Sequence, residues 1–262
     1  MSSSQPYTTK LGVGLGVIDE TRILLELWQP GMKAGDLYRY ALDSGSLPNI
    51  SARRLNNLVK ELFVTRYLVV GDYPANVLKD MLPFLSYAEW CQLLFIFTCR
   101  VNAVLADYII EEYWPRYAGG HTNIDNNDAR EFIQRAIEQG KTAHSWSSKT
   151  IQNVAGYVTG CCADYGLLES GQRRVRRIIP FRLEPRVAAF LAYDLHFSGW
   201  NDNALIMHRD WLLFGMDDIE VRELLKSLAL KGFVIIQSAA DITRISWKYK
   251  DWGELIRAIS QG

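Results

Sequence analysis

The chain has 262 residues, and 48% of them are hydrophobic, so it can bury one large core or two moderate ones. Its 29 basic and 29 acidic side chains cancel, which excludes the high net positive charge of many nucleic-acid-binding proteins. Any attraction for nucleic acid must therefore come from a local cluster of charge.

Residues 1–118 predict an N-terminal helical bundle. Apolar residues recur there at spacings of three and four, and Pro, Gly and Ser mark the ends of the periodic stretches. Ser86 and Glu89 form a capping box before the longest and most aromatic stretch, which we expect to end near Trp114 and Pro115. The expected helices cover residues 20–28, 36–42, 51–66 and 86–114.

A segment rich in Gly, Asn and Thr, residues 119–127, is the clearest boundary in the sequence. Beyond it, residues 126–183 predict a winged-helix-like unit, because a helix, a turn, a longer helix and two strand-like runs follow in that order. The expected helices are 128–139 and 148–165, and the expected strands are 167–169 and 175–181. The predicted buried stripe of the longer helix is Ile151, Val154, Val158, Cys161 or Cys162, and Tyr165.

Residues 184–262 show a similar order of elements without a residue-level repeat. The expected helices are 185–196, 202–214 and 217–231, followed by a hairpin of 233–237 with 242–248 and a terminal helix at 252–259. The sequence therefore predicts an all-α (mainly helical) fold with two small β-hairpins. Its parts are a helical bundle and two winged-helix-turn-helix-like units.

The cysteines and histidines predict no metal site. Cys91, Cys99, Cys161 and Cys162 lie in apolar stretches without C-x-x-C spacing, and the histidines are scattered. We expect reduced core cysteines, no metal and no cofactor. The N-terminus lacks the pattern of a secretory signal, and the aromatic helix has too short an uncharged run to span a membrane. We therefore expect a soluble, cytoplasmic protein that does not contact membranes.

A basic cluster marks the wing of the first winged-helix-like unit. Five arginines lie between Glu169 and Glu184 with no acid among them, which gives a local charge of +5. The planar donor fork of arginine suits phosphate oxygens, so the cluster predicts contact with the DNA backbone. Alternatives are a solvated strand face or ion pairs to a partner domain. The five residues are Arg173, Arg174, Arg176, Arg177 and Arg182.

The helix before the wing begins with polar residues. A helix N-terminus offers free amide donors to a phosphate, and Lys, Gln and Asn can meet base edges in the major groove. Gly156 on the outer side would allow close approach to a backbone. An ordinary capped helix with a polar outer face is the alternative. The candidate DNA-binding residues of this helix are Ser147, Ser148, Lys149, Thr150, Gln152 and Asn153.

The second winged-helix-like unit differs in charge, because residues 201–225 hold six acids against two arginines. This net charge of −4 would repel phosphate, so we expect the unit to contact protein, or only its own neighbouring domain. Another basic spot, Arg53, Arg54 and Lys60, would extend a DNA track, although an ordinary exposed helix face explains it better.

No nucleotide loop or catalytic motif is recognisable. The run LGVGLG places glycines at 12, 14 and 16, but it lacks G-K-[ST] and does not lie in a βαβ unit. It predicts a flexible or tightly turning N-terminal segment. G-x-S-x-G and catalytic-cysteine signatures are missing as well. We therefore expect no enzymatic activity and no small-molecule substrate.

Several short motifs follow one another in a characteristic order. They are the Gly-rich segment LGVGLG at residues 11–16 (the Gly-rich lead-in), Glu20-Thr21-Arg22, Leu24-Leu25-Glu26-Leu27-Trp28, the aromatic helix around residues 90–113, Trp146-Ser147, Trp211-Leu212-Leu213-Phe214-Gly215 and Gly232. This arrangement resembles the A protein (BrxA) family of bacteriophage-exclusion (BREX) phage-defence systems. The resemblance spans most of the chain and includes no catalytic signature. Members of the family are often shorter, so the acidic C-terminal unit is the part that it covers least.

The resemblance implies a small, mainly helical, non-catalytic component that binds double-stranded DNA. It also implies partners encoded together with it, among them a methyltransferase, an ATPase and other phage-defence proteins. One alternative is a protein–protein scaffold of the same assembly, in which the arginines meet an acidic partner. Another is an RNA-binding protein, although the chain lacks the paired aromatic motif of an RNP sheet.

Overall fold

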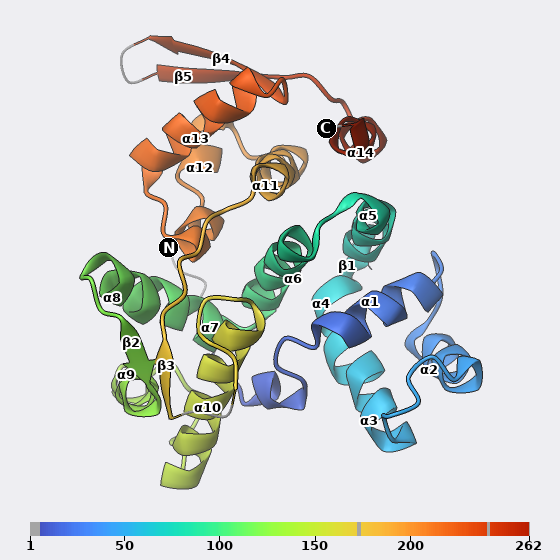
Figure 1. The fold of residues 1–262 in the computed structure, drawn as a ribbon, viewed down its shortest axis with the longest axis vertical. Helices are drawn as coiled ribbons and strands as arrows, with labels where there is room; N and C mark the ends of the chain where they lie inside the picture. Colours follow the sequence, from blue (N-terminus) through green and yellow to red (C-terminus); the bar gives the residue numbers. More distant parts are fainter. Residues whose placement is uncertain (1–5, 172–173, 240–241, 262) are drawn as a thin grey trace. The chain divides into compact units, whose positions relative to one another are not determined.

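The structure, a computed structural model, describes residues 6–171, 174–239 and 242–261 (Figure 1). In these residues the fold is mainly helical with two two-stranded antiparallel sheets, which confirms the expected fold class. The chain divides into two compact units. Unit 1 comprises Met1–Lys79 and Leu94–Phe181, and unit 2 comprises Asp80–Leu93 and Arg182–Gly262.

This division differs in layout from the three domains expected from the sequence, which were 1–118, 126–183 and 184–262. Residues on both sides of the Gly- and Asn-rich segment 119–127 belong to unit 1. A short stretch before the middle of the chain, Asp80–Leu93, belongs to the same unit as the C-terminal residues. The structure thus groups in one compact unit two segments that the sequence analysis treated separately.

The N-terminal helices lie close to their predicted positions. Ser51 caps the third of them, because its side chain accepts a hydrogen bond from Arg54 N at 3.2 Å. The expected helix 51–66 contains a π-helical stretch, Leu58–Phe63, between two α-helical parts. The observed helices are α1 (Ile18–Leu27), α2 (Ala34–Ser44), α3 (Ala52–Asn57) and α4 (Val64–Tyr67).

The expected long aromatic helix is broken in the structure. Its capping box is present, since Ser86 N donates to Glu89 Oε2 at 2.7 Å and Glu89 N donates to Ser86 Oγ at 3.3 Å. The helix then stops at Asn102, whose side-chain Nδ2 donates to Thr98 O at 2.8 Å and so competes with the helical backbone pattern. The single helix was therefore a wrong prediction, and four elements replace it. They are α6 (Tyr87–Val101), α7 (Ala103–Tyr108), a π-helix (Ile109–Tyr113) and α8 (Trp114–Ala118).

Pro115 does not end this helical region, as the sequence had suggested. It lies in the first turn of α8, where its missing N–H is not needed by the helix. Residues 69–84 had no predicted helix or strand. The structure has β1 (Val69–Asp72), α5 (Tyr73–Met81) and a 3₁₀ helix (Leu82–Phe84) there.

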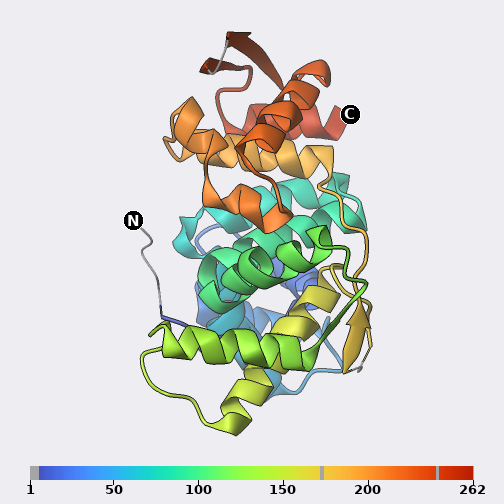
Figure 2. The ribbon, with the colours of Figure 1, turned by 90° about the vertical axis from the view of Figure 1, so that its left-hand side faces the viewer.

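The C-terminal half of unit 1 contains two helices and a small sheet. The helices are α9 (Asn126–Glu138) and α10 (Ser148–Asp164), which pack side by side (Figure 2). The strands are β2 (Asn123–Asp125) and β3 (Val175–Arg177), which pair antiparallel. The predicted stripe of α10 is confirmed, because Ile151, Val154, Val158, Cys161, Cys162 and Tyr165 are all buried.

Unit 2 follows its predicted element order with one difference. The expected helix 202–214 is split, because His208 has extended backbone angles and its Nδ1 accepts a hydrogen bond from Asp210 N. The hairpin is confirmed as β4 (Val234–Ala239) paired antiparallel with β5 (Ile242–Trp247). The helices are α11 (Pro185–Phe197), α12 (Asp202–Ile206), a 3₁₀ helix (Arg209–Phe214), α13 (Asp218–Leu230) and α14 (Trp252–Gln261).

In the part of the chain that the structure describes, no single helix has both the length and the apolar character needed to cross a membrane. Two segments, Tyr87–Val101 and Ala103–Ala118, meet these criteria of length and composition only when taken together, and they are bent by 112° at the break between them.

Candidate nucleic-acid interface

The strand that carries the arginines, β3, is held on both sides. On one side β2 pairs with it, with Asn123 opposite Arg177. On the other side Leu168 and Ile178 form an isolated antiparallel bridge, and Glu169 N donates to Arg177 O at 2.8 Å. The expected hairpin therefore takes the form of this bridge, while the longer ladder of β3 runs along β2.

Strand β2 was not predicted from the sequence, because it lies in the segment that we interpreted as a domain boundary. Its central residue, Ile124, is only 1% exposed, but its neighbours Asn123 and Asp125 are polar. A single apolar residue is too weak a signal for a strand of this length. The partner of β3 is thus separated from it in the chain by two helices.

Two wing arginines of unit 1 present exposed side chains. Arg174 and Arg177 are both exposed, and the backbone carbonyl of Arg174 accepts a hydrogen bond from Asn126 N at 3.0 Å. This bond fixes the chain just before β3 to the start of α9. Arg182 is exposed too but belongs to unit 2, and Arg173 lies outside the described residues.

Arg176 has a different environment from its neighbours. It pairs across the ladder with the buried Ile124, so its side chain starts on the inner face of the strand. Arg176 Nη1 donates to Glu169 O at 2.9 Å, and the side chain is partly buried. Its charge also acts on Asp164, whose carboxyl pKa is raised by burial and lowered in part by Gly16 N–H and Arg176. Arg176 therefore holds the wing to the body of unit 1.

The first turn of α10 is capped and accessible. Ser147 Oγ accepts a hydrogen bond from Thr150 N at 3.1 Å, as its position before the helix predicted. Ser148, Lys149 and Gln152 are exposed, whereas Thr150 and Asn153 are partly buried. A Cβ added at Gly156 would meet no atom within 4 Å, so this turn of the helix faces open space.

The turn that leads into α10 is tied to the rest of unit 1 by Lys141. Its Nζ lies 3.0 Å from Asp107 Oδ2 and 2.9 Å from Glu111 Oε1. Its backbone carbonyl accepts a hydrogen bond from Tyr7 N at 2.7 Å. Burial lowers the pKa of Lys141, but the hydrogen bonds to Glu111 and Asp107 outweigh this effect and raise it, so the ammonium stays charged. The position of the helix start is thus fixed by charged contacts.

The Gly-rich lead-in packs directly on α10. A Cβ at Gly12 would lie 2.4 Å from Cε2 of the Tyr157 ring, and a Cβ at Gly16 would lie 2.6 Å from Asp164 Cβ. Gly16 N also donates to Asp164 Oδ2 at 2.9 Å. The glycines are therefore needed for close approach to the helix. The segment forms a 3₁₀ turn, Lys10–Val13, in agreement with the expected tightly turning segment.

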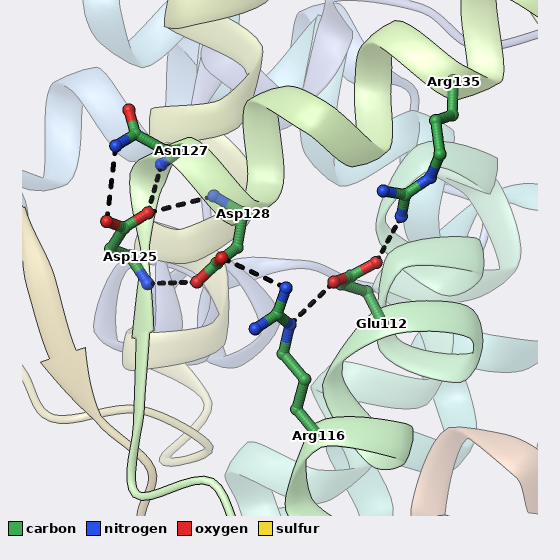
Figure 3. A network of polar contacts seen from close by, with 6 residues as sticks. All are labelled: Glu112, Arg116, Asp125, Asn127, Asp128 and Arg135. Carbon is green, nitrogen blue, oxygen red and sulfur yellow. Dashed lines mark hydrogen bonds and ion pairs between the residues drawn. The ribbon is translucent and has the colours of Figure 1, made fainter.

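A charged network fixes α9 (Figure 3). Glu112, which is 7% exposed, accepts hydrogen bonds from Arg116 Nε at 2.7 Å and from Arg135 Nη2 at 2.6 Å. Arg116 Nη2 also lies 3.1 Å from Asp128 Oδ1. Asp128 forms a capping box with Asp125 at the start of α9, so the network joins the preceding helices to the end of β2.

The other basic spot is only partly available to a ligand. Arg53 and Lys60 are exposed. Arg54 is exposed as well, but its Nη1 donates to the backbone carbonyl of Val13, so it holds the Gly-rich lead-in. This contact gives Arg54 a structural role that sequence reasoning could not detect, since its partner lies 41 residues earlier.

Four of the six acids in residues 201–225 lie in the first turns of α13 or at its N-cap. Asp217 and Glu220 form a capping box there, and Asp218 is paired with Arg222. Glu223 is paired with Lys226 at 2.7 Å. These acids lie on the helix that corresponds in order to α10 of unit 1.

The cysteines occupy the core. Cys91, Cys99, Cys161 and Cys162 are buried free thiols, and burial raises the pKa of Cys161 to about 12. A thiol with such a pKa is a poor nucleophile at neutral pH. Among the residues that the structure describes, no group of three or more His, Cys, Asp or Glu side chains is placed to hold a metal ion.

Comparisons with known proteins place the chain beside one family. The family model described as BrxA matches residues 5–194, which is more than half of the chain. A crystal structure of an uncharacterized protein from Magnetospirillum magneticum is similar with a TM-score of 0.57 and 15% sequence identity. The match covers 74% of this chain and 95% of that protein, and at this identity it shows a shared fold. No curated protein matches the chain.

Proposed function

Because the chain belongs to the BrxA family and is a component of a BREX phage-defence system, we propose that it binds double-stranded DNA through unit 1. The contacting elements are the first turn of α10 and the wing that leads into β3. The observation that carries the proposal is the exposure of Arg177 on β3, which is paired with β2, and of Arg174 just before it.

The arrangement of elements supports this assignment. A strand, two helices, the Leu168 segment and the returning strand β3 follow in the order of a winged helix, and β3 lies between its two neighbours. In that family of DNA-binding domains the second helix reads the major groove and the wing contacts the backbone. Here α10 and the wing take these two roles.

The side chains divide into contacting and positioning groups. Arg174, Arg177 and Lys149 are exposed and are assigned to phosphate, while Gln152 is assigned to a base edge. Arg176 positions the wing through Glu169. Contacts between cationic side chains and DNA phosphates contribute most of the affinity for DNA and make that affinity depend strongly on salt concentration.

We propose further that the chain has no catalytic activity of its own. The dispersed histidines and the buried cysteine thiols support this proposal. Its role in the defence system is then to hold DNA for the proteins with which it works.

The test is a titration of a short duplex with the full chain at a series of salt concentrations. In a plot of log affinity against log salt concentration the slope is negative, and each lost phosphate contact reduces its magnitude by about 0.9. A variant with Arg174→Gln and Arg177→Gln should therefore lose about two units of slope relative to the unaltered chain. A matched control with Arg244→Gln and Lys226→Gln, two cations of unit 2, should keep the slope.

Three results would contradict the proposal in different ways. An unaltered slope in the wing variant would remove the wing from the interface. Absence of duplex binding by the full chain, with its defence partners still bound, would favour the scaffold. Tighter binding of duplex RNA than of duplex DNA would favour the RNA-binding alternative.

A further inference from the structure

The hydrogen-bonding direction of each residue in the β4–β5 hairpin can be read from its register. Ile236 lies opposite Ile245, and Ile245 N donates to Asp202 Oδ2 of α12 at 3.0 Å. The N–H of Ile245 therefore points away from β4, and this pair is one of the non-hydrogen-bonded pairs of the ladder. It follows that Ile236 directs its own N–H and C=O away from β5.

A second observation also indicates that the backbone groups along β4 point alternately toward and away from β5. Phe233 and Lys248, which would form the next hydrogen-bonded pair, are joined through the hydroxyl of Tyr193. Tyr193 Oη donates to Phe233 O at 2.7 Å and accepts from Lys248 N at 3.0 Å. Residues with odd numbers in β4 thus face β5, and Val234, Ile236 and Ser238 direct their backbone groups outward.

The two edges of this sheet differ. Asp202 of α12 covers the edge of β5, and Figure 1 shows β5 between β4 and α12. At the outer edge of β4, by contrast, the N–H groups of Val234 and Ile236 donate to no group within the described residues. Such an edge can accept another strand.

Strand β4 lacks the charged residues and prolines that commonly prevent an edge strand from pairing with another chain. The strand reads Val-Ile-Ile-Gln-Ser-Ala, with no charged residue and no proline. Ile235, on the outer face, is 53% exposed. A second copy of the same strand would therefore approach without repulsion between like charges.

We propose that β4 pairs antiparallel with β4 of a second copy of this chain. The two copies would be related by a twofold axis beside Ile236, so that each Ile236 bonds to its counterpart. Val234 of one copy then lies opposite Ser238 of the other, and every outward backbone group of these three residues obtains a partner. Ile235 is covered by Gln237 of the second copy. The β4–β5 hairpins of the two copies then form one four-stranded sheet.

The test is the mass of the full chain by sedimentation equilibrium over micromolar to millimolar concentrations. We expect a dimer of twice 29.9 kDa that dissociates on dilution. Ile236→Pro removes the outward N–H without touching the bonds between β4 and β5. It should weaken dimerisation by about tenfold or more, because each copy loses a donor at the axis.

A second variant tests the proposal independently in case Ile236→Pro does not fold. Ile235→Lys keeps every backbone group and adds a charge at the edge of each copy, so it should also weaken the dimer. Leu230→Lys is its matched control, since Leu230 is exposed at the end of α13 and not on the strand. The control should dimerise as the unaltered chain does. A chain that stays monomeric throughout, or dimers that persist in both edge variants, would overturn the proposal. In the monomeric case the edge would be open to a strand of another protein.

Discussion

In both units helices precede a strand of a small antiparallel sheet, but the units differ at the edges of their sheets. In unit 1, β3 has β2 on one side and Leu168 on the other, and its free surface is basic. In unit 2, the hairpin has one edge covered by the carboxylate of Asp202 and one edge open. The same succession of elements thus carries exposed arginines beside β3 in unit 1 and an uncharged edge strand, β4, in unit 2.

The buried charges differ in the same way. In unit 1 the side chain of Glu112 is buried and has two arginine partners. In unit 2, burial and the nearby charge of Asp210 raise the pKa of Asp194 to about 8. The side chain of Glu112 in unit 1 thus has two charged partners, whereas the carboxyl of Asp194 in unit 2 is largely neutral at pH 7.

The largest expected effect is the loss of the charged network in unit 1. Glu112→Ala leaves Arg116 and Arg135 without their shared partner and should lower the free energy of unfolding by about 2–3 kcal/mol. This is below the range for a fully buried pair, because both arginines retain access to water. Urea unfolding of the full chain would measure it.

Glu131→Ala is the control for this change, because Glu131 is an exposed residue of α9. It should change the stability by less than about 0.5 kcal/mol. Equal losses in the two variants would mean that the network contributes no more than an ordinary surface charge, and the contrast between the units would fail.

The next effect concerns the Gly-rich lead-in. Gly12→Ala would place a Cβ too close to the Tyr157 ring and displace the segment from α10. It should lower the free energy of unfolding by about 1–3 kcal/mol. Gly35→Ala in α2 is the control, since an added Cβ there meets nothing within 4 Å. Thermal unfolding of both variants would compare them. A neutral Gly12→Ala would show that the lead-in is not packed on α10.

The sequence predicted those parts of the fold that depend on local pattern. The buried stripe of α10 and the capping box of Ser86 and Glu89 follow from spacing alone. The break at Asn102 did not, because the flanking residues continue the apolar pattern and one side-chain hydrogen bond decides the outcome. The pairing of β3 with β2 was missed for the related reason that it joins segments far apart in the chain.

The candidate interface was predictable in composition but not in orientation. The basic cluster and the cap at Ser147 were visible in the sequence. The inward direction of Arg176 depends on its partner Ile124, which no local pattern identified. Likewise, the contact of Arg54 with Val13 required the fold. Side-chain direction in a short strand is fixed by its partner strand, so charge alone could not separate contacting from positioning arginines.

A pH series tests the buried carboxyl of unit 2. Below about pH 4 the carboxyl of Asp194 is protonated in the folded and unfolded states alike. As the pH rises toward 8, the unfolded state releases this proton while the folded state retains it, so stability falls across this window and levels above it. Asp194→Asn removes this titration.

The variant should therefore gain stability relative to the unaltered chain as the pH rises from about 4 to about 8. Unfolding temperatures of the two proteins at each pH provide the difference, in which the titration of all other groups cancels. A constant difference would show that Asp194 titrates alike in both states, and the contrast in buried charge would be lost.

The smallest expected effect separates helix stability from DNA contact in unit 1. Gly156→Ala adds a Cβ in open space within α10 and should raise the free energy of unfolding by about 0.5–1 kcal/mol, because alanine favours the helix. If the outer face of α10 lies against a DNA backbone, the same methyl group should weaken duplex binding although the protein is more stable. A variant that gains stability and binds DNA unchanged would place the contact at the first turn of the helix and the wing, away from Gly156. Opposite signs in the two measurements cannot arise from altered folding, so this small change reports on the interface itself.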